Sequence, residues 1–376
     1  MTPRRPYTIL HTESSRGWGG QERRILSEAQ AMRERGHRLL IACDPRGELF
    51  GRAREAGFPV FPLRFGGLAN IAACLKLRHH LHEAGVEILN THSSLDSWVG
   101  LMAWKSLRTR PVLVRTRHLS TPVRRSRPTR WLYQTPGAVI TTGEATRELL
   151  ATRVGVPRER IFSIPTGICL EDFAPRAPEA GLRTRLDLPA DAFVFGIVAV
   201  LRSWKGHLYL LEALKELITG GAPAFLVVVG KGPYREVIRG CIRELGLGPW
   251  VRLVGYHDDV APWLALMDAV VLPSYSNEGV PQALIQAMVM GRPVVGAAIG
   301  GIPEIVIPGQ TGLLTPPRDP HALAQAMRRL MEDAELCARL GRGGRDLVCR
   351  RFSLESMAEQ VERVYDGIVG GGPGGR

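Results

Sequence analysis

The most constraining feature of this sequence is a repeated alternation between short apolar runs and longer segments with apolar residues at helical spacing. Apolar runs at residues 8–11, 38–44 and 59–63 precede helical patterns at 71–84 and 95–107. Short apolar runs between helices are typical of strands that are buried on both faces of a sheet. The alternation therefore predicts an α/β protein with doubly wound parallel sheets.

The length and composition indicate two globular domains. The chain has 376 residues, of which 45% are hydrophobic and 23% charged, and this length exceeds one ordinary core. Proline and alanine accumulate at 175–179, so we expect a hinge there, between domains at 1–175 and 176–352. A helix is expected at 353–368, followed by a flexible glycine-rich tail at 369–376. No apolar run is long enough to span a bilayer and no signal-peptide core is found, which predicts a cytoplasmic protein.

A polar loop follows the apolar run at 269–272, where a strand is expected to end and a helix to begin. The loop carries Ser274, Asn277, Glu278 and Gly279. Open α/β sheets bind ligands at the carboxyl ends of their strands, and the N–H groups of a helix start attract anions. We therefore expect a ligand loop here, although a lone glutamate in such a place is ordinarily a solvated loop acid.

Two cations stand at another expected junction of strand and helix. Arg202 and Lys205 follow the apolar run at 193–200. The planar fork of an arginine and the mobile charge of a lysine can together hold a diphosphate. The alternative is that both cations are solvated, but a helix start repels positive charge. Their placement therefore favours an anionic ligand.

A third polar loop, at residues 14–24, lies between the first strand and the first helix. Gly17, Gly19 and Gly20 would let a ligand approach the backbone closely. Their spacing differs from that of the dinucleotide fingerprint, which disfavours a nicotinamide dehydrogenase. Glu22 is expected to interact with the helix dipole.

Together these motifs resemble those of the retaining glycosyltransferases of family 4, enzymes of the GT-B fold that use nucleotide-sugar donors. Glu278 matches the first acid of the family's E-G-x-P/G loop, and Gln286 replaces the second acid, which follows after seven intervening residues. Arg202 and Lys205 match a shortened R-x-x-x-K-G signature. The resemblance implies two Rossmann-like domains that face each other across a cleft, with the last helix crossing back onto the first domain.

The resemblance also implies a role for each matched residue. Contacts with the transferred sugar are expected from Glu278 and from His118, although a histidine at a strand end is as often a satisfied polar residue. The residues expected to bind the donor diphosphate are Arg202, Lys205, Gly19, Gly20, Gly279 and Val280. Those expected to bind the nucleotide and its ribose are Gln286, Gly230, Gly232 and Tyr256. Neither a cofactor nor a metal is expected.

The cysteines and the paired aspartates do not suggest a metal site. The six cysteines are scattered without a C-x-x-C pair, so neither a disulfide framework nor a zinc site is expected. Asp258 and Asp259 precede a short helical pattern, where capping of the helix is favoured over metal binding.

The net charge of +13 is concentrated in part in the span 97–143, which contains no acidic residue. The expected acceptor or membrane surface consists of Arg117, Arg124, Arg125, Arg127, Arg130 and Trp131. Cations beside aromatic residues are typical of surfaces that bind anionic lipid headgroups. A solvated basic loop is the alternative, and no nucleic-acid motif accompanies the cluster.

The sequence thus predicts a glycosyltransferase that moves a sugar from a nucleotide diphosphate, with UDP as the expected nucleotide. The expected acceptor is a saccharide or is lipid-linked, as in lipopolysaccharide or exopolysaccharide biosynthesis, and the protein is expected in the cytoplasm or at the inner face of the membrane. Two alternatives remain: a non-hydrolysing sugar-nucleotide epimerase of the same fold, and a non-catalytic binding protein, which the Gln286 change favours.

Overall fold

The computed structural model describes residues 5–118, 121, 123–276 and 278–370, and it divides into two compact units. Unit 1 comprises Met1–Gly167 and Leu354–Arg376, and unit 2 comprises Ile168–Ser353. The division falls before the hinge expected at 175–179, because Ile168 is buried in the second core and its amide donates to the Phe352 carbonyl at 2.9 Å. Residues 371–376 of the expected tail lie outside the described residues.

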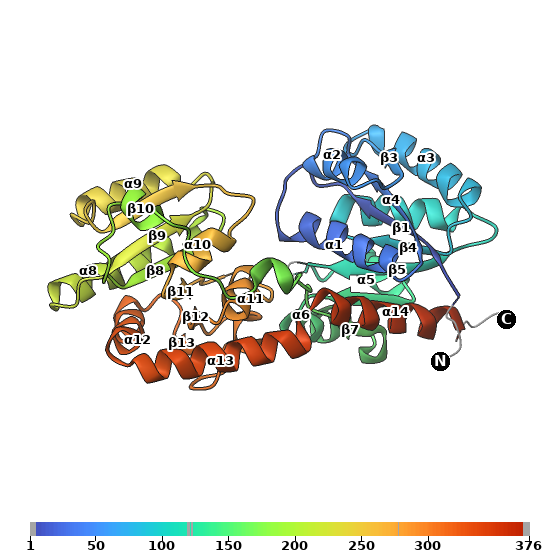
Figure 1. The fold of residues 1–376 in the computed structure, drawn as a ribbon. Helices are drawn as coiled ribbons and strands as arrows, with labels where there is room; N and C mark the ends of the chain where they lie inside the picture. Colours follow the sequence, from blue (N-terminus) through green and yellow to red (C-terminus); the bar gives the residue numbers. More distant parts are fainter. Residues whose placement is uncertain (1–4, 119–120, 122, 277, 371–376) are drawn as a thin grey trace. The chain divides into compact units, whose positions relative to one another are not determined.

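Unit 1 is built on a parallel sheet of seven strands in the order β3-β2-β1-β4-β5-β6-β7 (Figure 1). The strands are largely buried, and in β1 the apolar residues Ile9 and Leu10 are fully inaccessible. The strands are β1 (Thr8–Glu13), β2 (Arg38–Cys43), β3 (Val60–Pro62), β4 (Ile88–Thr91), β5 (Val112–Arg117), β6 (Ala138–Thr141) and β7 (Ile161–Ser163).

Helices cover both faces of this sheet. The described helices are α1 (Gly20–Glu34), α2 (Glu48–Glu55), α3 (Ala69–Glu83), α4 (Ser94–Lys105), α5 (Arg127–Gln134), α6 (Glu144–Leu149) and α14 (Leu354–Gly370), with a π-helical turn at Leu150–Val154 and a 3-10 turn at Arg158–Arg160. One core joins the sheet to α1, α2 and α14 through Ile25, Leu49 and Tyr365. A second core on the other face joins it to α3, α4 and α5 through residues such as Leu77 and Leu132.

Unit 2 is built on a parallel sheet of six strands in the order β10-β9-β8-β11-β12-β13. The strands are β8 (Val194–Val198), β9 (Phe225–Val229), β10 (Val251–Gly255), β11 (Ala269–Leu272), β12 (Val294–Ala297) and β13 (Leu313–Thr315). The helices are α7 (Leu182–Arg185), α8 (His207–Thr219), α9 (Arg235–Glu244), α10 (Ala261–Leu266), α11 (Gln282–Val289), α12 (Pro320–Glu332) and α13 (Ala334–Arg351), with 3-10 turns at Glu171–Phe173, Ser203–Lys205 and Ile302–Glu304.

The predicted doubly wound parallel sheets are confirmed in both units, since every ladder between named strands is parallel. In each sheet the strand order reverses once, between β1 and β4 in unit 1 and between β8 and β11 in unit 2. Such reversal points open a crevice at the carboxyl ends of the strands. Within the described part of the chain, no helix is both long and apolar enough to cross a bilayer.

Candidate active site

The loops after β8 and β11 meet at the reversal point of the second sheet. Lys205, in the 3-10 turn after β8, places its Nζ 2.5 Å from Glu278 Oε1 in the loop after β11. Ser274 Oγ donates to the same carboxylate oxygen at 2.7 Å. Arg202 is exposed, and its guanidinium lies 5.2 Å from the ring centroid of Trp204. The two loops that the sequence singled out separately, one with Arg202 and Lys205 and the other with Ser274 and Glu278, therefore share one end of the sheet.

The Lys205–Glu278 ion pair is only partly open to solvent. The lysine side chain is 20% exposed and the glutamate side chain 5%. A lysine ammonium has three N–H donors, so the pair leaves donors for a further acceptor. The sequence assigned the sugar to Glu278 and the diphosphate to Lys205, whereas the structure shows that the two side chains form one cluster.

Backbone packing holds these loops together. Gly206, at the start of α8, has φ +77°, and a Cβ built there would lie 2.0 Å from the Pro273 carbonyl oxygen. The Tyr275 amide also donates to the Trp204 carbonyl at 2.9 Å. Since the glycine lets the two backbones touch, the distance between Lys205 and the Glu278 loop is set by main-chain contacts.

Apart from Gln286, the residues expected to bind the nucleotide lie on the neighbouring loops after β9 and β10. The Gly230 amide donates to the Gly255 carbonyl at 2.7 Å, and the Leu201 amide donates to the Lys231 carbonyl at 3.1 Å. Lys231 Nζ lies 4.1 Å from the ring centroid of Tyr256. The loops after β8, β9 and β10 are thus linked side by side, and Tyr256 borders them.

The remaining donor residues of unit 2 lie in the same turns and on α11. Gly232 follows Gly230 in the turn after β9, and its carbonyl accepts from the Arg235 amide at 3.3 Å. Gly279 is half-buried and Val280 is buried, just before α11. Gln286 is half-buried within α11. Asn277, which was expected in this loop, lies outside the described residues.

In unit 1 the reversal point lies between β1 and β4. Ser14 Oγ and Ser93 Oγ, in the loops after these two strands, are 2.6 Å apart. Gly19 and Gly20 stand at the start of α1, and the Gly19 amide donates to Glu22 Oε2 at 2.8 Å. Glu22 therefore caps its own helix, in keeping with the expected interaction at the helix start.

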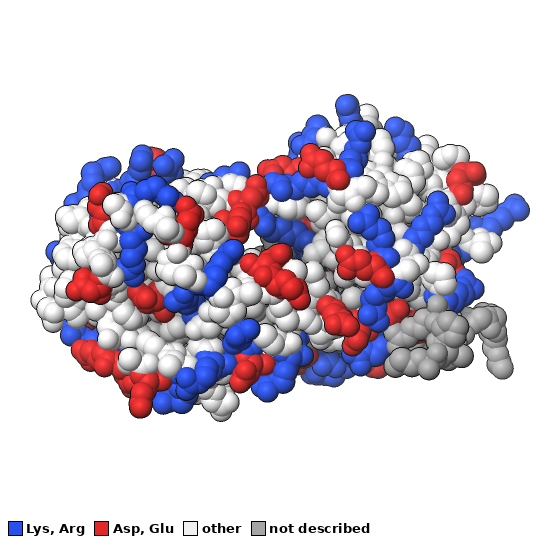
Figure 2. Space-filling model, in the orientation of Figure 1, with Lys and Arg blue, Asp and Glu red and all other residues white. Residues whose placement is uncertain are grey.

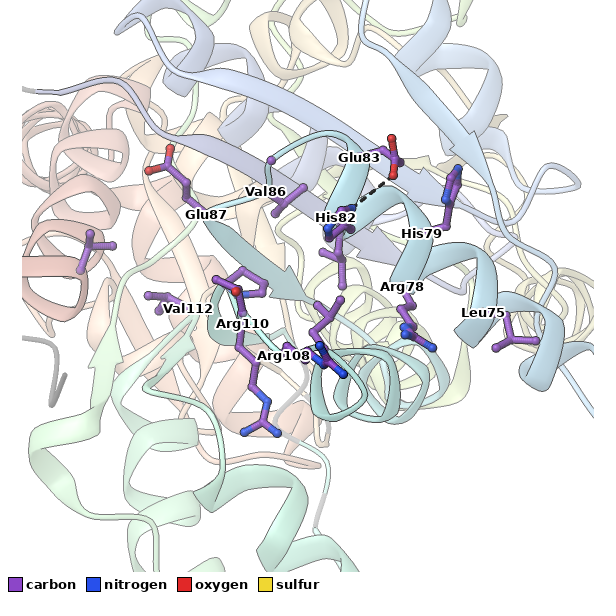
Figure 3. A pocket seen from close by; sticks show the side chains of 16 residues that line it. Leu75, Arg78, His79, His82, Glu83, Val86, Glu87, Arg108, Arg110 and Val112 are labelled. Carbon is purple, nitrogen blue, oxygen red and sulfur yellow. Dashed lines mark hydrogen bonds and ion pairs between the residues drawn. The ribbon is translucent and has the colours of Figure 1, made fainter. Parts of the chain in front are cut away.

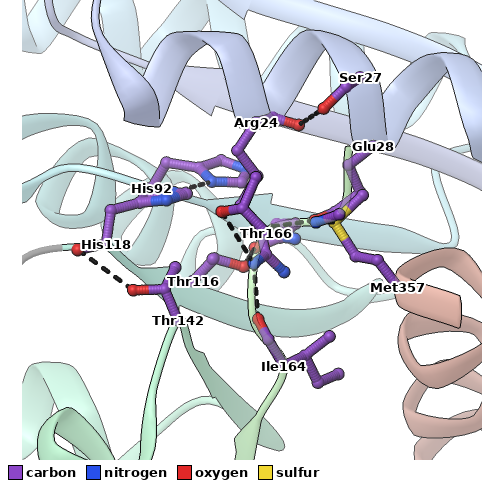
Figure 4. Close-up of polar contacts among 12 residues, drawn as sticks. Arg24, Ser27, Glu28, His92, Thr116, His118, Thr142, Ile164, Thr166 and Met357 are labelled. Atoms are coloured by element: carbon purple, nitrogen blue, oxygen red, sulfur yellow. Dashed lines mark hydrogen bonds and ion pairs between the residues drawn. The ribbon is translucent and has the colours of Figure 1, made fainter. Parts of the chain in front are cut away.

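Three histidines form a continuous chain beside this point, and Figure 4 shows the contact between two of them, His92 and His118. His11 Nδ1 lies 2.9 Å from His92 Nε2, and His92 Nδ1 lies 2.9 Å from His118 Nε2. Burial lowers the pKa of all three imidazoles below the ordinary value, and that of His92 and His118 well below it. The rings are therefore neutral near pH 7, and each contact needs one donor and one acceptor nitrogen. The proton positions are thus coupled along the chain, so His92 helps to set the tautomer of His118.

A buried arginine links α1 to the segment that follows β7 (Figure 4). Arg24 and Glu28 form an ion pair at 3.1 Å, and both side chains are inaccessible to solvent. An Arg24 guanidinium N–H donates to the Ile164 carbonyl at 2.5 Å, and the same nitrogen is 3.5 Å from Thr166 Oγ1. The sequence did not indicate this contact, because its partners lie far apart along the chain and follow no motif.

A pair of buried acids, also missed in the sequence, stands at the same end of the sheet. Burial is the main cause that raises the pKa of Glu13 to about 8, and repulsion by the neighbouring Asp96 carboxylate adds to it. Asp96 accepts from Thr12 Oγ1 and from the His92 amide, each at 2.8 Å. Glu13 at the end of β1 and Asp96 in the first turn of α4 were detectable only as polar residues next to apolar runs.

The basic segment divides into half-buried and exposed parts. Arg117, expected at the surface, donates to Tyr133 Oη at 2.7 Å and to the Thr121 carbonyl at 2.6 Å. Trp131 packs against Trp98, with ring centroids 5.9 Å apart. The arginines that stay exposed are Arg124, Arg125, Arg127 and Arg130. Figure 2 shows Lys and Arg side chains over the face in view of both units, with acidic side chains between them.

The paired aspartates contact protein groups. Asp259 Oδ1 accepts from the Ala261 amide at 2.9 Å at the start of α10, and Asp258 accepts from Tyr256 Oη at 2.6 Å. Among the described residues, no group of three or more His, Cys, Asp or Glu side chains is arranged to hold a metal ion.

Two family models match this chain, one in each unit. Residues 18–172 match the family described as Glycosyltransferase Family 4, and residues 192–333 match the family described as Glycosyl transferases group 1. The chain belongs to these glycosyltransferase families. The predicted family is therefore confirmed.

Individual proteins agree with this family. The chain is 28% identical over 233 residues to an alpha-D-kanosaminyltransferase of Streptomyces kanamyceticus, a match that covers 61% of this chain and 60% of the relative. The chain spans about half to two thirds of the length of the curated relatives it matches.

Solved structures show the same fold. A glycosyltransferase of Rickettsia africae superposes with a TM-score of 0.89 at 20% identity, over 97% of this chain and 99% of the other. Anabaena Alr3699/HepE in complex with UDP-glucose superposes with a TM-score of 0.85 at 24% identity, over 96% and 100%. The chain therefore has the GT-B type of fold, with two Rossmann-like domains.

Proposed function

We propose that this chain transfers a sugar from a UDP-sugar to a saccharide or lipid-linked acceptor, with retention of configuration and without a metal ion. The observation that carries the proposal is the Lys205–Glu278 ion pair at the reversal point between β8 and β11. A cation and an acid in contact at this position suit a donor that has a diphosphate next to a hydroxyl-bearing sugar.

In the proposed reaction the chain's own charges stabilise the leaving group. The departing nucleoside diphosphate gains negative charge. Lys205, the neighbouring Arg202 and the N–H groups at the start of α11 would stabilise that charge. Glu278 would accept hydrogen bonds from the sugar hydroxyls while it orients Lys205. His118, with its tautomer set through His92, would contact the transferred sugar.

The nucleotide and acceptor are proposed from chemistry and likeness. Gln286 would accept from a ribose hydroxyl through its amide oxygen, and Gly230, Gly232 and Tyr256 would border the base. The structure of HepE with UDP-glucose supports a uridine nucleotide. The acceptor class that we propose is the one used in cell-envelope, lipopolysaccharide or exopolysaccharide assembly, reached from a peripheral position at the membrane. The exposed cations Arg124, Arg125, Arg127 and Arg130 would attract anionic acceptors.

Calorimetric titration with UDP, GDP and ADP, with and without a chelator, tests the donor site. We expect UDP to bind with or without chelator, and Arg202→Gln and Lys205→Met to weaken it by about 10-fold to 100-fold, since a hydrogen bond to a charged group contributes about 1.5–3 kcal/mol. Arg239→Gln, which removes an exposed arginine of α9, is the matched control. Binding that requires a divalent ion and ignores both substitutions would contradict the proposal.

Product analysis tests the reaction itself. Incubation with UDP-sugars and a saccharide acceptor should give a product whose anomeric configuration, read by NMR, matches that of the donor. Conversion of the donor to its epimer without acceptor would favour an epimerase instead. Nucleotide binding with no turnover of any kind would favour the binding-protein alternative.

A further inference from the structure

Exposed apolar side chains gather on two adjacent helices of unit 1. Of the seven large hydrophobic side chains exposed among the described residues, five lie on α3, at its N-cap or on α4. They are Leu68, Ile71, Leu75, Leu95 and Met102, exposed by 86%, 63%, 61%, 45% and 39%. The other two, Val200 and Val237, lie apart in unit 2.

The spacing of these residues defines one outward face. Leu68, Ile71 and Leu75 follow a helical period along α3, and Leu95 and Met102 lie about two turns apart on α4. The opposite side of both helices packs on the sheet through residues such as Leu77 and Leu101, and α3 and α4 pack against each other. The exposed residues therefore do not contribute to the core. Together they form a surface that we call the α3–α4 face.

Cations border the α3–α4 face at a groove of about 1000 Å³. Leu75 lines this groove together with Arg78 from α3 and Arg108 and Arg110 from the loop after α4 (Figure 3). Arg110 also lies over Trp104, with its guanidinium carbon 4.9 Å from the ring centroid. The groove thus joins the apolar face to three guanidinium groups.

Two acids, Glu83 and Glu87, line the same groove, so they offset part of the charge of the three arginines. Between residues 56 and 143 the sequence contains only Glu83, Glu87 and Asp96 as acids, and Asp96 is buried. Glu87 pairs with Arg5 and accepts from the Thr8 amide, whereas Glu83 lies beside His82. Apolar side chains bordered by cations match the boundary between anionic lipid headgroups and acyl chains.

We propose that the α3–α4 face docks on an anionic lipid bilayer, with Leu68, Ile71, Leu75, Leu95 and Met102 entering the acyl boundary. The arginines of the groove would contact headgroup phosphates. A bilayer is favoured over a second copy of the chain, because a symmetric contact through this face would bring like charges together. This proposal deepens the proposed function and rests on it, because a lipid-linked acceptor is the reason for the chain to bind a bilayer. Leu95 lies two residues after Ser93 at the reversal point, so a docked α3–α4 face would present such an acceptor beside the reversal point.

Vesicle flotation tests the docking. The full chain is mixed with vesicles of phosphatidylcholine alone or with vesicles that also contain about 30% phosphatidylglycerol, which supplies negative charge. We expect binding at least about tenfold tighter to the anionic vesicles, and a loss of about tenfold or more in Ile71→Ser/Leu75→Ser and in Arg78→Gln/Arg108→Gln/Arg110→Gln. Val200→Ser/Val237→Ser, which removes the exposed apolar residues of unit 2, is the matched control and should float like the parent.

The outcomes separate this proposal from the proposed function. The docking proposal is overturned if the parent chain stays unbound with both vesicles, or if the α3–α4 variants bind as the parent does. It is also overturned if light scattering shows a dimer that Ile71→Ser/Leu75→Ser dissociates, since a second copy then covers the face. UDP titration of the same samples shows whether they are folded. UDP binding without docking would contradict the docking proposal alone. Docking without UDP binding would contradict the proposed function.

Discussion

Replacement of Gly206 by alanine tests how tightly the loops of the candidate active site are packed. The left-handed backbone at this position, φ +77°, costs an alanine about 1–2 kcal/mol. The new Cβ would also lie 2.0 Å from the Pro273 carbonyl oxygen, so the two loops must separate, and overpacking of this kind costs about 1–3 kcal/mol more. We therefore expect Gly206→Ala to destabilise unit 2 by about 2–5 kcal/mol in total.

Gly221→Ala is the matched control for the backbone term. Gly221 follows α8 and has φ +76°, but a Cβ there meets no heavy atom within 4 Å. Its replacement should cost only the backbone term of about 1–2 kcal/mol and leave the loops in place. The difference between the two variants isolates the contact between Gly206 and Pro273.

Because the two units can unfold separately, the assay must report on unit 2 alone. Hydrogen exchange of peptides from β8 to β12, followed across a urea series, gives that free energy of unfolding. Separation of the loops should also displace Lys205 from Glu278 and weaken UDP binding about tenfold or more, whereas Gly221→Ala should bind UDP like the parent. Equal stability and equal UDP affinity in the two variants would refute the reasoning.

Three further predictions concern buried ionisable groups. Arg24→Met should lower the stability of unit 1 by about 3–5 kcal/mol, because it leaves the Glu28 carboxylate buried and unpaired, and the double variant with Glu28→Leu should recover most of this loss in urea unfolding. The raised pKa of Glu13, about 8 in the folded state against 4.5, means that its contribution to stability is present below pH 4.5 and is lost as the pH rises to 8, by up to about 1.4 kcal/mol per pH unit. Glu13→Gln should therefore gain stability relative to the parent across this range, and a constant difference would count against it. Burial lowers the pKa of His207 to about 4 from 6.5, so stability should fall as the pH drops from 6.5 to 4, and hydrogen exchange of unit 2 should show a shallower fall in His207→Leu.

The elements that the sequence predicted well are those whose signal is local. The apolar run at 269–272 became β11, and the loop after it holds Glu278 at the reversal point, because a buried strand followed by an amphipathic helix leaves few alternatives in a parallel sheet. The helix at Glu48–Glu55 was missed, since it is short, and only Leu49 and Ala53 of its residues are buried.

The contacts that the sequence could not give are those between distant segments. Lys205 and Glu278 are 73 residues apart, and His11 and His92 are 81 apart. The sequence singled out Lys205 and Glu278 as charged residues after apolar runs, but the pairing depends on the order of strands across the sheet. That order follows from the whole fold and not from any spacing within a motif. The roles proposed for these residues remain predictions.

The path of the chain through the two units has a consequence for synthesis on the ribosome. Unit 2 is inserted between Gly167 and Leu354, and the core of unit 1 includes Met357, Val361 and Tyr365 from α14. At about 5–20 residues per second, roughly 10–40 s pass between the emergence of these two parts of unit 1. During that interval the apolar surface that α14 covers is open on a nascent sheet, whereas unit 2 has all its strands once β13 has emerged and can fold before α14 arrives. The domain that starts first therefore finishes last, and nascent chains are most exposed to aggregation before α14 arrives.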